Sequence, residues 1–244
     1  MSLFSPTTLD GLRAAAEEAR AAGDERAQRV CGALVEAVTL CDRGQRERAR
    51  GVIDDAMART TDPRLLFLGY QFHFRCGRLD EAEALIRRRL AVAPAESAEA
   101  ARAWNNLGLL LHFRGDRPGA EAMLTRALEL DRRIGCAEGE ARDLCNLGLI
   151  PEAAGELERA AGLYQEALAV AERVGFLPVA ASALANLGDI ARARGRPGEA
   201  RGLWERAVEL FWKLGDRERR EEFSAKLAGL GPDAVGGNRD NEGP

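Results

Sequence analysis

The sequence is poor in lysine, histidine and cysteine, and these shortages exclude several kinds of site. Only two of its 35 basic residues are lysines, Lys213 and Lys226, and it has only two histidines, His73 and His112. Five cysteines are scattered over 244 residues without a Cys-x-x-Cys pair, so neither a disulfide framework nor a zinc site is predicted. The cysteines are Cys31, Cys41, Cys76, Cys136 and Cys145. We expect free, buried thiols in a reducing cytosol.

Long apolar runs and blocks of like charge are also missing. No apolar run approaches the roughly 18 residues that a membrane helix needs. The N-terminal stretch MSLFSPTTLDGLRAAAEEAR has neither the basic segment nor the apolar segment of a secretory signal. The 39 acidic and 35 basic residues are interleaved and give a formal net charge of -4. This pattern predicts a cytoplasmic protein that binds neither nucleic acid nor membrane.

The sequence offers no constellation for catalysis. The two histidines fall in different repeats, and no serine or cysteine nucleophile stands in a recognisable motif. No glycine-rich phosphate loop follows a strand, because no strand pattern occurs. We predict a protein that is not an enzyme, with no catalytic residue, no metal site and no cofactor, and we expect the histidines to be packing or groove residues.

What the sequence does contain is a repeat of 40 residues. The passages at 105–128, 145–168 and 185–208 align without a gap. Residues in equivalent positions are Gly108, Gly148 and Gly188, then Ala120, Ala160 and Ala200, then Ala127, Ala167 and Ala207. Apolar residues recur at three- and four-residue spacing twice in each unit, with a glycine between the two runs at 115, 155 and 195. Each unit is therefore predicted to be a helix, a tight turn and a helix.

These positions resemble the signature of the tetratricopeptide repeat family. The first of these three repeats has Trp104, Leu107, Gly108, Ala120, Leu124 and Ala127. The next has Leu144, Leu147, Gly148, Ala160, Tyr164 and Ala167, and the third has Leu184, Leu187, Gly188, Ala200, Trp204 and Ala207. The resemblance implies an all-α fold, a right-handed α-solenoid of stacked helix-turn-helix repeats. The units exceed the family's usual 34 residues, and the extra residues extend each second helix to a C-cap glycine at 135, 175 or 215.

The pattern weakens toward the N-terminus, where Gly69 is one residue early and Arg89 replaces a small residue. We expect an N-terminal helix in 1–24, a weak repeat in 25–62, repeats in 63–96, 97–136, 137–176 and 177–216, a C-terminal capping helix in 217–230 and a disordered tail in 231–244.

Gly108 and Pro151 are residue types that destabilise a helix, and both lie inside a predicted helix. A glycine inside a helix costs about 1 kcal/mol relative to alanine, so we expect Gly108 to lie opposite Ala120 at a close helix crossing. Pro151 falls inside a first helix, where proline removes one hydrogen bond and clashes with the preceding turn. We expect either a local distortion, with a kink or an early helix end, or a kink that widens a groove for a partner.

In a stack of this family the first helices line the inner surface. Helical spacing places a second stripe opposite the packing face, and we predict that it binds a partner. The candidate residues are Arg102, Asn105, Asn106, Leu109, Phe113, Arg142, Asn146, Leu149, Asn186, Asp189 and Arg192.

Asparagine recurs at one repeat position, as Asn106, Asn146 and Asn186. An amide both donates and accepts hydrogen bonds, and family members of this kind hold peptide backbones with asparagines at this position. The alternative is that each amide caps or bridges neighbouring helices. The family's lysine-and-asparagine clamp for C-terminal carboxylates is not reproduced, since these faces carry no lysine.

The sequence thus predicts a non-catalytic scaffold or adaptor that holds a protein or peptide ligand in its groove. The alternative function is a sensory or regulatory module, similar to the repeat regions of bacterial transcription regulators. No helix-turn-helix DNA-binding region is visible, so such a module would act through another subunit. An apolar end with Phe211 and Trp212 is a candidate for self-association.

Overall fold

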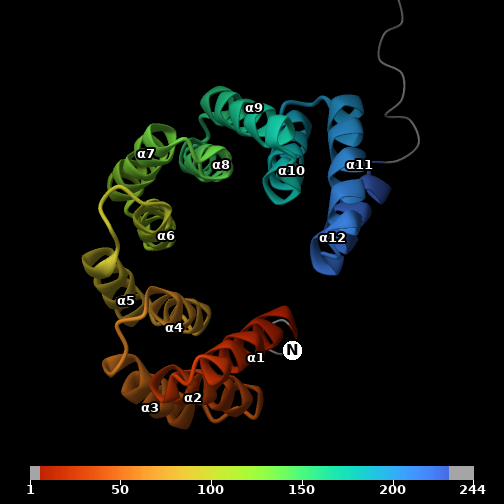
Figure 1. Cartoon of the computed structure of the whole chain (residues 1–244). Helices are drawn as coiled ribbons and strands as arrows, with labels where there is room; N and C mark the ends of the chain where they lie inside the picture. The colour runs from red at the N-terminus through yellow and green to blue at the C-terminus, as the bar shows by residue number, and fades with distance from the viewer. Residues whose placement is uncertain (1–5, 231–244) are drawn as a thin grey trace, which may run out of the picture. The chain divides into compact units, whose positions relative to one another are not determined.

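The structure is a computed structural model that describes residues 6–230, and these residues form twelve α-helices and no strand (Figure 1). The first unit of the chain contains α1 (Pro6–Ala21), α2 (Glu25–Asp42), α3 (Arg46–Ala58), α4 (Pro63–Arg75), α5 (Leu79–Val92) and α6 (Ala98–Phe113). The remaining helices are α7 (Arg117–Ile134), α8 (Ala137–Ala153), α9 (Leu157–Val174), α10 (Leu177–Ala193), α11 (Pro197–Lys213) and α12 (Arg217–Ala228). The tail expected in 231–244 lies outside the described residues.

The helices belong to two compact units divided between Ala120 and Glu121, so that α7 begins in the first unit and continues in the second. In the first unit α2 packs against α3, α4 against α5, and α2 also against α4. In the second unit α8 packs against α9 and α10 against α11, and α9 also packs against α10. Each unit by itself therefore confirms the predicted all-α class of stacked helix-turn-helix repeats.

Glycines close the turns between helices. Gly175 follows α9 with a φ of 70°, and its N–H donates to the carbonyls of Ala171 and Glu172. Residues with a Cβ rarely adopt this left-handed conformation, so glycine is required there. The predicted caps Gly135 and Gly215 have φ values of 73° and 69°, which confirms them.

Pro151 does not shorten its helix. α8 ends at Ala153, one repeat before the end of α10 at Ala193, so the two helices stop in register. Pro151 lies in the last turn, where its carbonyl accepts the N–H groups of Ala154 and Glu156. Because the chain is already leaving the helix there, the proline is accommodated, and the expected early end does not occur.

The interior glycines of the second unit face aromatic rings. A Cβ added to Gly148 would lie 2.4 Å from Cε1 of Tyr164, and one added to Gly188 would lie 2.3 Å from Cδ1 of Trp204. Both rings are fully buried. We expected such a glycine to face an alanine of the second helix. In these two repeats the glycine instead faces the ring that lies four residues after that alanine, because the ring needs the space that a Cβ would take.

In the first unit an interior glycine of a first helix faces a methionine and not an aromatic ring. A Cβ on Gly69 would lie 2.1 Å from the Met57 sulfur, so a flexible thioether takes the place of a ring. The unusual Arg89 is 7% exposed, and its guanidinium lies 5.1 Å from the centroid of the Phe67 ring. A cation over an aromatic face accounts for this arginine where the other repeats have alanine.

His73 is a buried polar residue on α4, only 1% exposed. Its Nε2 lies 3.6 Å from an Asp54 oxygen, and the Arg78 guanidinium donates two hydrogen bonds to the same carboxylate. The pKa of His73 is lowered to about 4, and burial is the main cause. The Arg78 charge also lowers this pKa, by more than the Asp54 charge raises it. The folded protein therefore keeps His73 neutral at pH values at which an exposed histidine is charged.

This burial predicts acid sensitivity. Between pH 6.5, the ordinary pKa of histidine, and about pH 4, His73 is protonated in the unfolded chain and neutral in the folded chain. The free energy of unfolding therefore falls as the pH falls through this range. His73 should contribute about 1–2 kcal/mol of lost stability between pH 7 and pH 5. Denaturant unfolding of the wild type and of His73→Gln at both pH values tests this. A wild-type loss that persists in full in His73→Gln would contradict it.

The glycine–ring contact predicts a large effect of one methyl group. Gly148→Ala should destabilise the protein by about 1–3 kcal/mol, because the Tyr164 ring or the helix must shift to admit the Cβ. Gly162→Ala is the matched control, since a Cβ there meets nothing within 4 Å and alanine is the better helix former. Thermal unfolding of both variants checks the prediction, and equal melting temperatures would refute it.

Candidate partner-binding site

α8 and α10 present the same stripe of partly exposed side chains. The three positions on α8 recur on α10 after one period of 40 residues, and the residues between them are buried. The stripe consists of Arg142, Asn146 and Leu149 on α8, and of Ser182, Asn186 and Asp189 on α10. These positions are three and four residues apart, so they lie along one side of each helix. We call this set the second-unit face.

Arg142 is held in place by two buried carboxylates. Its guanidinium nitrogen lies 3.1 Å from an Asp131 oxygen and 3.4 Å from an Asp143 oxygen. Asp131 and Asp143 are 1% and 0% exposed. Buried carboxylates need a counter-charge, so part of the Arg142 charge serves α7 and α8 themselves.

Asn186 takes part in a chain of hydrogen bonds that joins three helices. Its amide hydrogen-bonds the Tyr164 oxygen on α9, and the Tyr164 O–H donates to the Glu152 carboxylate on α8. Burial is the main cause that raises the pKa of Tyr164, followed by the hydrogen bond to Glu152. A contact of this kind is what the helix-bridging interpretation of the repeated asparagine expects, and the binding interpretation stays open beside it. Asn146 also has an interaction partner within the protein.

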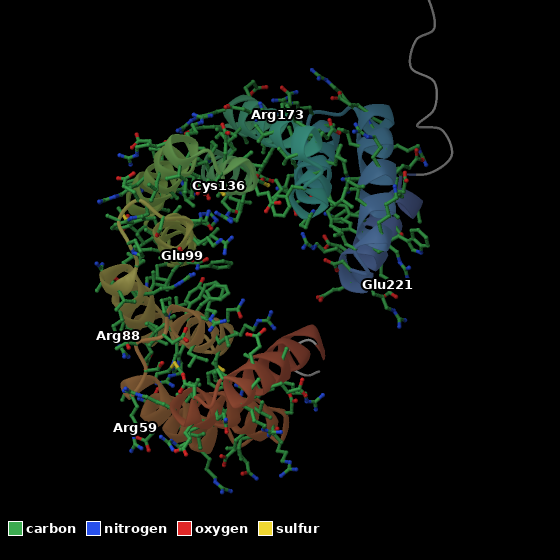
Figure 2. The ribbon with its side chains drawn as sticks, viewed as in Figure 1. Arg59, Arg88, Glu99, Cys136, Arg173 and Glu221 are labelled. Carbon is green, nitrogen blue, oxygen red and sulfur yellow. The ribbon has the colours of Figure 1, made fainter. Side chains whose placement is uncertain are left out.

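The C-terminal helix α12, on which Figure 2 labels Glu221, extends the second-unit face. Lys226 Nζ lies 2.9 Å and 3.1 Å from the two Asp189 oxygens. An Arg219 nitrogen donates to Ser182 Oγ at 2.8 Å. Sequence reasoning missed these two cations because it treated this helix only as a cap. The signal was the spacing of 37 residues, which brings each cation beside its partner on α10.

α12 also buries the end of the last helix pair. Phe223 is 5% exposed, and its ring stacks on Phe211 at 5.8 Å between centroids. Phe211 is fully buried by this packing, whereas Trp212 is 64% exposed. Of the two aromatic residues expected at an apolar end, only Trp212 is therefore available at the surface.

The first unit carries its own set of candidate residues, on α6. Arg102 is exposed, and Asn106 and Leu109 are partly exposed. Phe113 is 65% exposed, and its ring meets Phe74 of α4 edge-on at 4.9 Å between centroids. An exposed phenylalanine supported by a second ring is unusual for a surface that meets only water. We call these five residues the first-unit face.

Two further predicted site residues lie elsewhere. Asn105 is 2% exposed, so it faces the interior and is not offered to a partner. Its equivalents Cys145 and Ala185 are 6% and 2% exposed, and their apolar character was the available signal. Arg192 is exposed near the end of α10.

Within residues 6–230 no group of three or more histidine, cysteine or acidic side chains is arranged to hold a metal ion. Among the helices of this part of the chain, none combines the length and the apolar character needed to cross a membrane.

Solved structures with the same fold cover most of this chain. BtubC from P. vanneervenii is 21% identical, with a TM-score of 0.62 over 88% of this chain and 93% of its own. Aspartyl phosphate phosphatase F from Bacillus subtilis is 16% identical, with a TM-score of 0.72 over 89% of this chain and 60% of its own. The Rap conjugation gene regulator of plasmid pLS20, in complex with the Phr peptide, is 16% identical, with a TM-score of 0.68. The match covers 62% of that protein and 88% of this chain.

The chain spans about three fifths of the last two proteins, and at these identities the likeness concerns the fold alone. No curated protein sequence matches the chain. The family model "Tetratricopeptide repeat" matches residues 71–133, 99–173 and 141–213, which together span more than half of the sequence. The chain belongs to the tetratricopeptide repeat family.

Proposed function

We propose that the protein is a non-catalytic adaptor that binds an extended peptide or protein segment on the second-unit face. The observation that carries this proposal is the recurrence of three partly exposed positions on α8 and α10 after one repeat. Packed helices are about 8–10 Å apart, and an extended chain advances about 3.3–3.6 Å per residue. Successive helices would therefore meet roughly every third residue of a ligand.

The side chains of this face suit a peptide backbone. Each asparagine amide has two N–H groups and an oxygen with two lone pairs. One hydrogen bond from Asn186 to Tyr164 leaves further donor and acceptor capacity, and it also fixes the direction of the amide. Leu149 adds an apolar contact beside the amides. Preorganised groups lose less conformational entropy when they bind, which supports the use of this face for recognition.

The charges of this face are largely paired within the protein. Arg142 lies beside Asp131 and Asp143, and Arg219 pairs with Asp216. Lys226 pairs with Asp189 and Glu222. The face therefore has no excess of cations, and its amides and Leu149 set the character of the ligand.

The first-unit face is proposed as a second contact region. The exposed Phe113 and the partly buried Phe74 form an aromatic pair, and aromatic residues are enriched in protein interfaces. The exposed Arg102 lies on the same helix and adds a cation. This face suits an apolar side chain of the partner.

A regulatory module is the alternative function. One structural neighbour is a conjugation gene regulator in complex with a peptide, which supports peptide binding by this kind of fold. A peptide that altered the packing of the repeats could control a separate effector subunit. Capture of partners from a native lysate distinguishes the two, since an adaptor retains several proteins together and a module of this kind retains its effector.

A direct experiment selects peptides from a random display library on the immobilised protein. Enrichment of a shared extended sequence supports the proposal. Selected sequences that bind equally well to a variant with Asn146→Ala and Asn186→Ala would overturn it.

The double variant also separates binding from architecture. Removing two ligand hydrogen bonds, each net about 0.5–1.5 kcal/mol, should weaken a selected peptide by roughly 5- to 150-fold. The loss of the Asn186 bond to Tyr164 should cost about 1 kcal/mol of stability. Tyr164→Phe is the matched control, since it removes the same bridge and keeps both amides. Titration and thermal unfolding of all three proteins give the result; equal loss of binding in Tyr164→Phe would assign the amides to architecture.

The aromatic pair predicts a different outcome for the first unit. Phe113→Ser should leave the melting temperature nearly unchanged, because the side chain is 65% exposed. It should weaken binding of a full-length captured partner several-fold, because an interface anchor is lost. The exposed Trp212→Ser is the control for a general loss of surface apolar area. Equal effects of both substitutions on binding would contradict a specific role for Phe113.

A further inference from the structure

Two cysteines that are 35 residues apart in the sequence meet in the first unit. Cys41 lies in the last turn of α2, and Cys76 is the residue that follows α4. The two thiols are hydrogen-bonded to each other. Cys41 is 7% exposed, whereas Cys76 is more accessible. The pair could not be predicted from the sequence, because neither cysteine stands in a motif.

Both cysteines line a cavity of about 300 Å³ at the ends of α2 and α4. Its walls include Arg46, Arg75 and Arg78 beside the two cysteines. One water molecule occupies about 30 Å³ in the liquid, so a small oxidant has ample room. The cavity therefore gives a reagent a path to a thiol pair that already touches.

We propose that Cys41 and Cys76 are a redox modification site, at which a hydroperoxide converts the dithiol into an intramolecular disulfide. This inference goes beyond partner binding and does not depend on it. The sulfurs are in hydrogen-bond contact, so rotations of the two side chains and small backbone shifts bring them to the bonding distance of about 2 Å.

The reaction balances in two steps. The Cys76 thiolate attacks one oxygen of the hydroperoxide, the O–O bond breaks, and Cys76 becomes a sulfenic acid. The hydroxide or alkoxide that leaves takes up the proton released when the Cys76 thiol ionised, and departs as water or an alcohol. Cys41 sulfur then attacks the Cys76 sulfur, the S–O bond breaks, and hydroxide leaves with the Cys41 proton as water. Two thiols are oxidised by two electrons, and one peroxide is reduced.

The environment assigns the order of the two cysteines. Burial raises the pKa of Cys76, and the hydrogen bond from Cys41 and the charges of Arg46 and Arg78 oppose that rise. Burial raises the pKa of Cys41 to about 11, and the neighbouring Cys76 adds to this rise. Cys76 is therefore the first thiolate to form and Cys41 the resolving thiol. Because burial dominates at both cysteines, oxidation should be slow at pH 7 and faster at pH 9.

The consequence of oxidation is a covalent link between neighbouring repeats. The disulfide would join the end of α2 to the end of α4 and close the intervening chain, which contains the whole of α3. Cross-links of this kind stabilise mainly by restricting the unfolded chain. The oxidised protein should therefore melt several degrees higher than the reduced one, with the first unit held more rigidly.

The test uses the full chain treated with hydrogen peroxide or with dithiothreitol. Denatured thiol titration should fall from the five cysteines of the sequence to three. Peptide mass spectrometry without reduction should find a Cys41–Cys76 pair lighter by two hydrogens, and dithiothreitol should reverse it. Five remaining thiols, or a disulfide between any other cysteines, would overturn the proposal.

Variants identify the roles of the two thiols. In Cys41→Ser the sulfenic acid on Cys76 should persist long enough for a dimedone label, and in Cys76→Ser Cys41 should stay unlabelled. Cys145→Ser, which removes a buried thiol of the second unit, is the matched control and should still form the disulfide. Dimedone labelling of Cys41 rather than Cys76 would refute the assigned order.

Discussion

The architecture of the second unit depends on one contact, in which an aromatic ring of the second helix lies on a glycine of the first. At Gly148 and at Gly188 a single Cβ would come within 2.4 Å and 2.3 Å of the facing ring. The rings can be fully buried because their polar atoms are satisfied. The Tyr164 O–H donates to Glu152, and the Trp204 N–H donates to the Ala185 carbonyl at 3.2 Å. The cost of glycine inside a helix is thus offset by the burial of a large side chain.

The same contact links the core to the proposed binding face. The Tyr164 ring touches Gly148 on one helix, while its oxygen contacts Glu152 and Asn186. A ligand that drew the Asn186 amide toward itself would act on a ring that separates two helices. Binding at the proposed face would therefore share an element with packing, and repeat proteins transmit such changes chiefly between neighbours. This coupling is a physical reason to consider a regulatory role beside the adaptor role.

Much of the fold was predictable because the information is local and periodic. Apolar spacing fixed the helix pairs, and glycine at the turns marked positions that need a positive φ, as at Gly175. The stripe on α8 and α10 followed from helical spacing alone. What could not be predicted were contacts between side chains far apart in sequence, such as Lys226 with Asp189 and Cys41 with Cys76. Their meeting depends on how adjoining helices are staggered, which no periodicity within one helix reveals.

The first unit departs from the repeat consensus where its chemistry differs. A methionine replaces the ring beside Gly69, an arginine is buried over Phe67, and His73 is kept neutral near Asp54 and Arg78. Arg78 also borders the cavity that holds the two thiols. Each buried polar residue costs desolvation unless it is paired. These groups of the first unit lie around α2 to α5, whereas the buried charged residues of the second unit are Asp131 and Asp143 beside Arg142. The second unit packs rings on glycines, whereas the first packs a thioether on Gly69 and contains a buried neutral histidine and two neighbouring thiols.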